Sequence, residues 1–130
     1  MPEQLRISVK NPPTAQLAYD RELALRRLNG ELSLFRDLVG FYFEDSGRYL
    51  DEGRLHLTGE GLSDFARAMH RLRGLASNFE ARPLVDAVQL AEDAARGSQL
   101  EEAKRLFVIV EQEVERLRDA LEGDRRLDVA

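Results

Sequence analysis

Apolar and polar residues alternate with the period of an α-helix along most of the chain. The most regular stretch, residues 100–121, carries apolar residues in alternating steps of four and three: Ala103, Phe107, Val110, Val114, Leu117 and Leu121. Residues 62–79 repeat this pattern with Phe65, Met69, Leu72, Ala76 and Phe79. Such spacing places the apolar side chains on one face of a helix. No stretch has the period-two alternation of a strand bounded by turns.

Turn residues in the first half of the chain separate two expected helices. A short helix is expected over residues 19–28 and ends at Asn29-Gly30, since both residues tolerate the left-handed conformation of a helix end. A longer helix is expected over residues 31–56. Its first half, residues 32–43, is apolar almost all round, which predicts burial on more than one side.

Three more helices are expected in the second half. A turn at residues 57–61 leads into the helix over residues 62–79, and the next helix runs over residues 83–96 with Pro83 in its first turn. Ser98-Gln99-Leu100-Glu101 has the form of a capping box for the last helix. Short connections between amphipathic helices predict an all-α fold, an antiparallel up-and-down four-helix bundle with a short additional N-terminal helix.

The 130 residues are enough for one domain with one hydrophobic core. Residues 1–18 include three of the four prolines, so we expect a flexible N-terminal segment or linker there. We expect the helical bundle to occupy residues 19–122, and residues 123–130 to form a polar, frayed C-terminal tail.

Composition excludes several classes of function. A net charge of −5 argues against nucleic acid as the main partner. The absence of cysteine excludes disulfides, thiolate chemistry and zinc–cysteine sites. No apolar run is long enough for a membrane span, and the N-terminus lacks the apolar core of a signal peptide. We therefore expect a cytoplasmic protein with no membrane partner.

The sequence also lacks the common enzyme motifs. It has no glycine-rich loop that would cradle a phosphate, so no ATP-binding motif is recognisable. His56 and His70 are the two histidines, and neither has a second histidine or a glutamate at the spacing of a helical metal site. We expect no metal and no cofactor. Spacing alone leaves a Ser-His-Asp site open, but nothing marks a nucleophilic serine.

His70 lies on an unusual helix face. At roughly 100° per residue it points about 160° away from the middle of the apolar sector of its helix, and so outward. Ala66, Gly74 and Ser77 share this outer face, and all three are small. Glycine in a helix interior costs about 1 kcal/mol relative to alanine, so Gly74 indicates the close approach of another surface.

Three arginines lie near this histidine in an otherwise acidic chain. Arg67, Arg71 and Arg73 place positive charge beside the imidazole. An anion bound or transferred at His70 would be stabilised by that charge. A surface histidine without a function remains the alternative from the residues alone.

The segment His70-Arg71-Leu72-Arg73-Gly74, with the small and apolar residues that follow it to Ala81, resembles the signature of histidine phosphotransfer (HPt) domains. That signature is His-x-Leu-Lys-Gly, then small and apolar residues, then Gly-Ala. The resemblance covers about residues 19–121. It implies a four-helix bundle whose exposed histidine accepts a phosphoryl group from the aspartyl phosphate of a response-regulator receiver domain and passes it to another receiver.

The resemblance also implies roles for single residues. His70 matches the phosphoacceptor, and Arg73 stands where the family usually has a lysine that neutralises phosphoryl charge. Gly74 matches the glycine that lets the receiver approach. Glu92 falls where many members have a Glu or Gln that accepts a hydrogen bond from the imidazole, which would fix its tautomer. Glu80 departs from the pattern, because it replaces the second glycine.

Ala66, Ser77, Arg67 and Arg71 complete the expected docking face around His70. On this reading the protein is a phosphocarrier without autonomous ATP-dependent catalysis, and receiver domains are its partners. A second reading is a helical-bundle adaptor that binds a signalling partner through residues 32–43 without phosphotransfer. A third is the HPt-like domain of a chemotaxis-type kinase, in which a separate ATP-binding domain of a sensor kinase charges the histidine.

Overall fold

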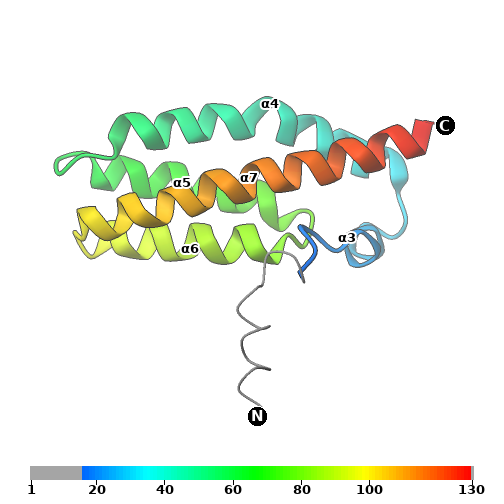
Figure 1. Cartoon of the computed structure of the whole chain (residues 1–130). Coiled ribbons are helices and arrows are strands. Elements are labelled where there is room, and N and C mark those ends of the chain that lie inside the picture. The colour runs from blue at the N-terminus through cyan, green and yellow to red at the C-terminus, as the bar shows by residue number, and fades with distance from the viewer. Residues whose placement is uncertain (1–15, 130) are drawn as a thin grey trace, which may run out of the picture.

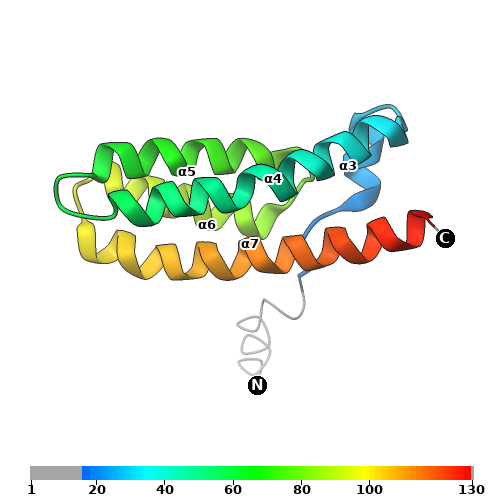
Figure 2. The ribbon, with the colours of Figure 1, turned by 90° about the horizontal axis from the view of Figure 1, so that it is seen from above.

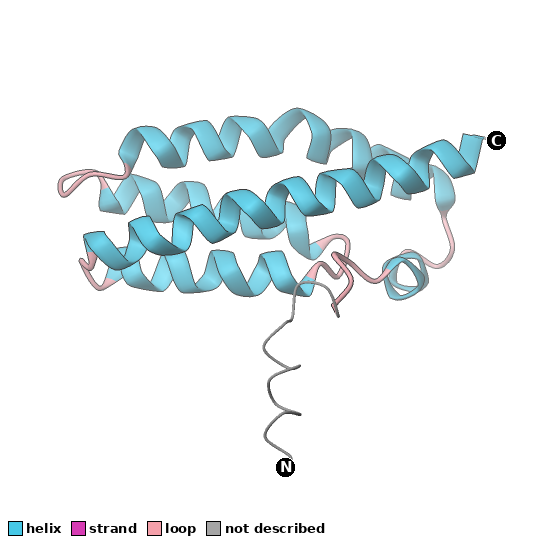
Figure 3. Cartoon of the chain, in the orientation of Figure 1, coloured by secondary structure: helices cyan, strands magenta, loops and turns pink. Residues whose placement is uncertain are grey.

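The structure, a computed structural model, describes residues 16–129. Most of the expected N-terminal segment, residues 1–15, lies outside this range. The described residues form helices and connecting loops, as Figure 3 shows. The helices are α3 (Arg21–Arg27), α4 (Leu32–His56), α5 (Leu62–Ser77), α6 (Arg82–Arg96) and α7 (Leu100–Val129).

Helices α4 to α7 run alternately in opposite directions and pack as a four-helix bundle (Figure 1). Consecutive helices pack against each other, and α4 and α7 close the bundle. Seen from above, α4 and α7 extend beyond the shorter pair α5 and α6 at the end where α3 lies (Figure 2). The all-α prediction of an antiparallel four-helix bundle with a short additional N-terminal helix is confirmed.

Several helix ends differ from the prediction, among them the start of the first helix and the end of the last. The first helix begins at Arg21 instead of residue 19, because the side chain of Asp20 accepts a hydrogen bond from the Leu23 amide at 2.9 Å and caps the helix there. The last helix continues through Gly123 to Val129, so the expected end at residue 122 is too early. A single glycine lowers helix propensity but does not end a helix by itself.

The predicted capping box at Ser98 is wrong. Ser98 has a φ of 59°, a left-handed conformation. Its amide bonds to the Ala95 carbonyl and that of Gln99 to the Ala94 carbonyl, which is the hydrogen-bond pattern of a Schellman motif. Ser98 therefore closes α6 and does not cap α7. The short connection requires a residue that reverses the chain, and that requirement overrides the capping preference of serine.

The first half of α4 is buried on one side only. Phe35, Val39 and Tyr42 face the core, whereas Leu34 and Phe41 are 43% and 51% exposed. The expectation that residues 32–43 are buried on more than one side is thus wrong, because α4 packs against the bundle along a single face. The Tyr42 hydroxyl donates to the Val114 carbonyl at 3.0 Å, and burial raises the pKa of Tyr42.

Phe79 fixes the corner between α5 and α6. Its ring is fully buried and makes edge-to-face contacts with Tyr19, Phe35 and Tyr42, with ring centroids about 6 Å apart in each pair. Such pairs add roughly 0.5–1.5 kcal/mol each beyond the burial of their area. Although α5 ends at Ser77, this cluster anchors its last turn to α4 and to the segment before α3.

Gly53 sets the distance between α4 and its neighbours. It is buried, and a Cβ at this position would lie 2.9 Å from Met69 Cε and 3.1 Å from Phe107 Cε1. The missing side chain lets α5 and α7 approach α4 closely at this level. Met69 directly precedes His70, so this contact helps to fix the rotation of α5 and with it the outward direction of the histidine.

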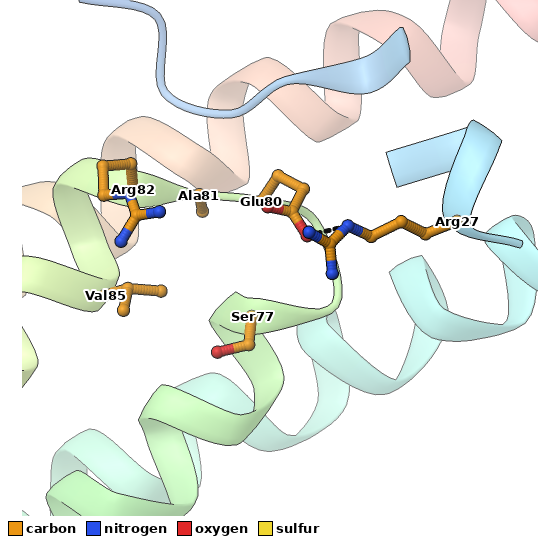
Figure 4. Close-up of a pocket in the computed structure, with 6 residues that line it drawn as sticks. All are labelled: Arg27, Ser77, Glu80, Ala81, Arg82 and Val85. Carbon is orange, nitrogen blue, oxygen red and sulfur yellow. Dashed lines mark ion pairs between the residues drawn. The ribbon is translucent and has the colours of Figure 1, made fainter. Parts of the chain in front are cut away.

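Glu80 occupies a position that glycine normally takes. Its φ is 54°, and the amides of Glu80 and Ala81 bond to the carbonyls of Ser77 and Ala76, again as in a Schellman motif. The Glu80 carboxylate pairs with Arg27 of α3 at 2.9 Å, beside a hollow of about 280 Å³ (Figure 4). The left-handed backbone at this corner explains why glycine suits position 80. The ion pair with Arg27 connects the Glu80 side chain to α3.

We predict that Glu80→Gly is more stable than Glu80→Ala by about 1 kcal/mol. Both variants lose the ion pair with Arg27, but only alanine keeps a Cβ in the left-handed conformation, which costs roughly 1–2 kcal/mol before the greater unfolded-state entropy of glycine is subtracted. Urea unfolding of the two variants measures the difference. Equal stabilities would contradict a strained Glu80.

Candidate functional site

His70 lies near the middle of α5 and points away from the bundle core. The buried residues Phe65, Met69, Leu72 and Ala76 hold the opposite face of the helix in the core. The His70 side chain is 61% exposed, as the helical wheel predicts. Its exposed position leaves the imidazole accessible to a second molecule.

One ring nitrogen of His70 faces the protein. Nδ1 lies 3.0 Å from a terminal nitrogen of Arg73, one turn further along α5. The same Nδ1 lies 3.5 Å from Glu92 Oε2 on α6. Nε2 makes no hydrogen bond within the described residues. The Nδ1 edge of the ring thus faces the protein, and Nε2 is the nitrogen that remains available to an incoming group.

Glu92 is a buried carboxylate, only 4% exposed, and lies between α5 and α6. Arg96 donates to its Oε2 from Nε at 3.1 Å and from a terminal nitrogen at 2.8 Å. Oε1 makes no hydrogen bond within the described residues, and Nε of Arg73 lies 3.9 Å from it. Two cations therefore compensate a charge that burial would otherwise destabilise. Glu92 is therefore not a solvated surface carboxylate.

Gln89 holds the guanidinium of Arg73. Gln89 Oε1 accepts from Arg73 at 2.5 Å, and its amide nitrogen donates to Asp93 at 3.0 Å. Gln89 and Arg96 were not predicted from the sequence as parts of the site. Both lie on one helical face with Glu92, three residues before it and four after it, so a search at that spacing would have found them once Glu92 was a candidate.

Four residues of the expected docking face are exposed on α5 near His70. Gly74 is exposed, and a Cβ added there would meet no atom within 4 Å, so no contact within the described residues requires glycine. Ser77 is exposed, and its hydroxyl donates to the Arg73 carbonyl. Arg67 and Arg71 are exposed and pair with Asp64 and with Glu52 respectively.

Ala66 does not belong to the exposed face. Its side chain is fully buried and lines a hollow together with Ala95 and Arg96 of α6. The expectation that Ala66 faces outward is therefore wrong. The helical wheel of α5 gives the direction of Ala66 correctly relative to His70, but α6 packs across that side and covers the smaller side chain.

Other kinds of site find no support in the part of the chain that the structure describes. No three histidine, aspartate or glutamate side chains there converge as metal ligands would. No helix in residues 16–129 combines the length and the apolar character needed to cross a bilayer.

Comparison with known protein families matches residues 37–120 to the family described as Hpt domain. This match covers more than half of the 130 residues, and the chain belongs to the Hpt domain family. Domains of this family carry phosphoryl groups on histidine in two-component systems. Comparisons with curated proteins and with solved structures gave no match.

We predict that Arg96→Met lowers the free energy of unfolding by roughly 1–3 kcal/mol, because it leaves the buried Glu92 carboxylate without its closest donors. Chemical denaturation monitored by circular dichroism measures this loss.

Arg105→Met is the matched control. Arg105 also donates two hydrogen bonds to a carboxylate, that of Glu102, and lowers its pKa, but this pair is exposed on α7. Exposed pairs contribute little, so we expect a clearly smaller loss. Equal losses in the two variants would contradict the importance of burial at Glu92.

Proposed function

We propose that this protein is a phosphorelay carrier that accepts a phosphoryl group on His70 from the aspartyl phosphate of a receiver domain and passes it to a second receiver. The observation that carries the proposal is an exposed imidazole with Arg73 and Glu92 beside its Nδ1 and with Nε2 left unbonded. A histidine without a function needs no buried carboxylate behind it, and burying Glu92 is unfavourable unless its charge is compensated.

The proposed transfer needs little covalent machinery from this chain. The Nε2 lone pair attacks phosphorus in line, an N–P bond forms, and the P–O bond to the aspartyl group breaks with its electron pair leaving on the carboxylate. Phosphoryl transfer depends mainly on positioning and charge neutralisation. His70 supplies the nucleophile and Arg73 the nearest cation, and we assign the acidic pocket and metal ion of the reaction to the receiver.

The surface around His70 suits the approach of a receiver. Gly74 and Ser77 are small and exposed, one turn and two turns beyond the histidine. Arg67 and Arg71 add positive charge on the same helix. We propose that these residues form the docking face, without Ala66. Receivers carry acidic phosphorylation pockets, so the charges of the two surfaces would be complementary.

Of the two other hypotheses, the adaptor fits the structure less well, and the kinase-charged domain differs only in the phosphoryl donor. A fully buried His70 would favour the adaptor without phosphotransfer, and His70 is exposed. A sensor kinase as donor, instead of a receiver, would use the same nucleophile. In either case the chain acts as a phosphocarrier without ATP-dependent catalysis of its own, and we propose that it works in the cytoplasm together with receiver domains.

The assignment of the phosphoacceptor is tested by His70→Gln. Incubation with a receiver domain charged by acetyl phosphate or by a kinase, using a labelled phosphoryl group, should label the wild-type chain and leave His70→Gln unlabelled. His56→Gln is the control, since His56 lies at the end of α4 and faces Asp64 at 3.8 Å, and it should label normally. Label retained by His70→Gln would overturn the proposal.

Gly74→Gln tests the docking face. Transfer from the receiver should become about tenfold slower or worse in kcat/KM, because a long side chain would hold the two surfaces apart. Folding should gain up to about 1 kcal/mol, since glycine is a poor helix former and the position is open.

Gly47→Gln is the matched control for this substitution. Gly47 is an exposed glycine of α4 with equally open surroundings, and α4 provides none of the contacts of His70 described above. The control should gain similar stability and keep wild-type transfer. An unchanged transfer rate in Gly74→Gln would show that no partner surface closes over this position.

A further inference from the structure

Two groups of opposite hydrogen-bonding character compete for one ring nitrogen of His70. The Arg73 guanidinium, at 3.0 Å from Nδ1, can only donate a hydrogen bond. The Glu92 carboxylate, at 3.5 Å from the same atom, can only accept one when ionised. A neutral imidazole carries a single proton, so Nδ1 satisfies one partner at a time.

The choice of partner decides whether His70 can react. When Arg73 donates to Nδ1, the neutral ring carries its proton on Nε2, and this nitrogen then has no lone pair for attack. When Nδ1 carries the proton and donates it to Glu92, Nε2 has a free lone pair and is the nucleophile. The shorter contact in the structure is the one with Arg73, which corresponds to the unreactive tautomer.

The surroundings favour Arg73 over Glu92 in the free domain. Gln89 accepts from the other terminal nitrogen of Arg73 at 2.5 Å and so holds the guanidinium beside the ring. Arg96 donates twice to Glu92 Oε2, the same oxygen that faces Nδ1, which weakens this oxygen as an acceptor for the imidazole. Both contacts come from α6, whose packing against α5 therefore biases the tautomer of His70.

We propose that Arg73 is a positioning residue that holds free His70 in the Nε2–H tautomer and releases it when a phosphoryl group attracts the guanidinium. This proposal rests on the proposed function and adds a control step to it. A phosphoryl group offers a guanidinium two charge-assisted hydrogen bonds, which are stronger than one bond to a neutral ring nitrogen. When Arg73 moves away, Nδ1 can carry the proton and donate it to Glu92. Nε2 then becomes the nucleophile as the phosphoryl group arrives.

The proton balance agrees with this order. The ring tautomerises by releasing the Nε2 proton to solvent and taking one up at Nδ1, with no net change. Attack by Nε2 then forms the N–P bond and releases the aspartyl carboxylate, and the proton stays on Nδ1. The phosphorylated ring is then cationic, and Glu92 faces its positive charge. Arg73 beside the same ring would be repelled, which is a second reason for it to leave Nδ1.

The test is a measurement of the His70 tautomer by ¹⁵N NMR in the unphosphorylated full chain, at a pH of about 8.5, where imidazole is ordinarily neutral. Protonated and unprotonated ring nitrogens resonate in separate regions, and His56→Gln assigns the signals of the two histidines. Wild-type His70 should be mainly Nε2–H. Arg73→Met should shift the ratio about tenfold or more towards Nδ1–H, because the donor is lost and Glu92 remains.

Arg71→Met is the matched control, since Arg71 lies next to His70 in the chain but pairs with Glu52 of α4 at 3.2 Å. It removes the same charge and should leave the tautomer ratio unchanged. A wild-type ring that is mainly Nδ1–H, or an Arg73→Met ratio equal to that of wild type, would overturn the proposal. An equal shift in Arg71→Met would also overturn it, because net charge alone would then set the ratio.

This readout separates the two proposals. The tautomer is measured without a receiver or a phosphoryl donor, so its outcome does not depend on whether His70 is phosphorylated. Failure of the tautomer test would leave labelling at His70 intact, whereas absence of labelling would remove the proposed function and leave the contact of Arg73 with the ring unexplained. Because Arg73 is partly exposed and lies outside the core, we expect the variants to fold, and their amide spectra check this.

Discussion

The buried carboxylate of Glu92 is the constraint on which the site depends. A charge only 4% exposed is stable between two helices only if cations lie beside it, and Arg96 and Arg73 provide them. This requirement places an arginine from α5 and an arginine from α6 around one carboxylate. It thereby fixes the register of the two helices at the level of His70. The same carboxylate then determines what the inner edge of the imidazole can bind.

The apolar pattern predicted the fold well, because helical periodicity reports burial directly. The seam of Phe65, Met69 and Leu72 defined the inner face of α5, and His70 is exposed as that seam requires. Phe41 is an exception to this rule. A run of apolar residues predicted burial all round, yet the bundle covers one face of α4, and only the positions of the neighbouring helices decide which apolar residues stay exposed.

The sequence predicted the site less completely than the fold. A helical wheel gives the direction of a side chain on its own helix but not the position of the next helix. Ala66 was therefore assigned to the exposed face although α6 covers it, and Gln89 and Arg96 were missed although they contact the residues around His70. The prediction of a capping box at Ser98 failed for a different reason. Ser98, like Glu80, is a non-glycine residue in the left-handed conformation, which residue preferences predict poorly.

The partners of the arginines near His70 differ in a way that bears on function. Arg67, Arg71 and Arg96 pair with carboxylates, so an incoming anion must displace a charged partner before it gains their full charge. The closest partners of Arg73 are neutral, the amide oxygen of Gln89 and Nδ1 of His70, and its ion pair with Glu92 is long at 3.9 Å. Exchanging these neutral acceptors and one long ion pair for a phosphoryl group costs less than breaking a close ion pair and gains charge-assisted bonds. Arg73 is therefore the cation of this face that a phosphoryl group can redirect most easily, and its movement is the one that frees the imidazole.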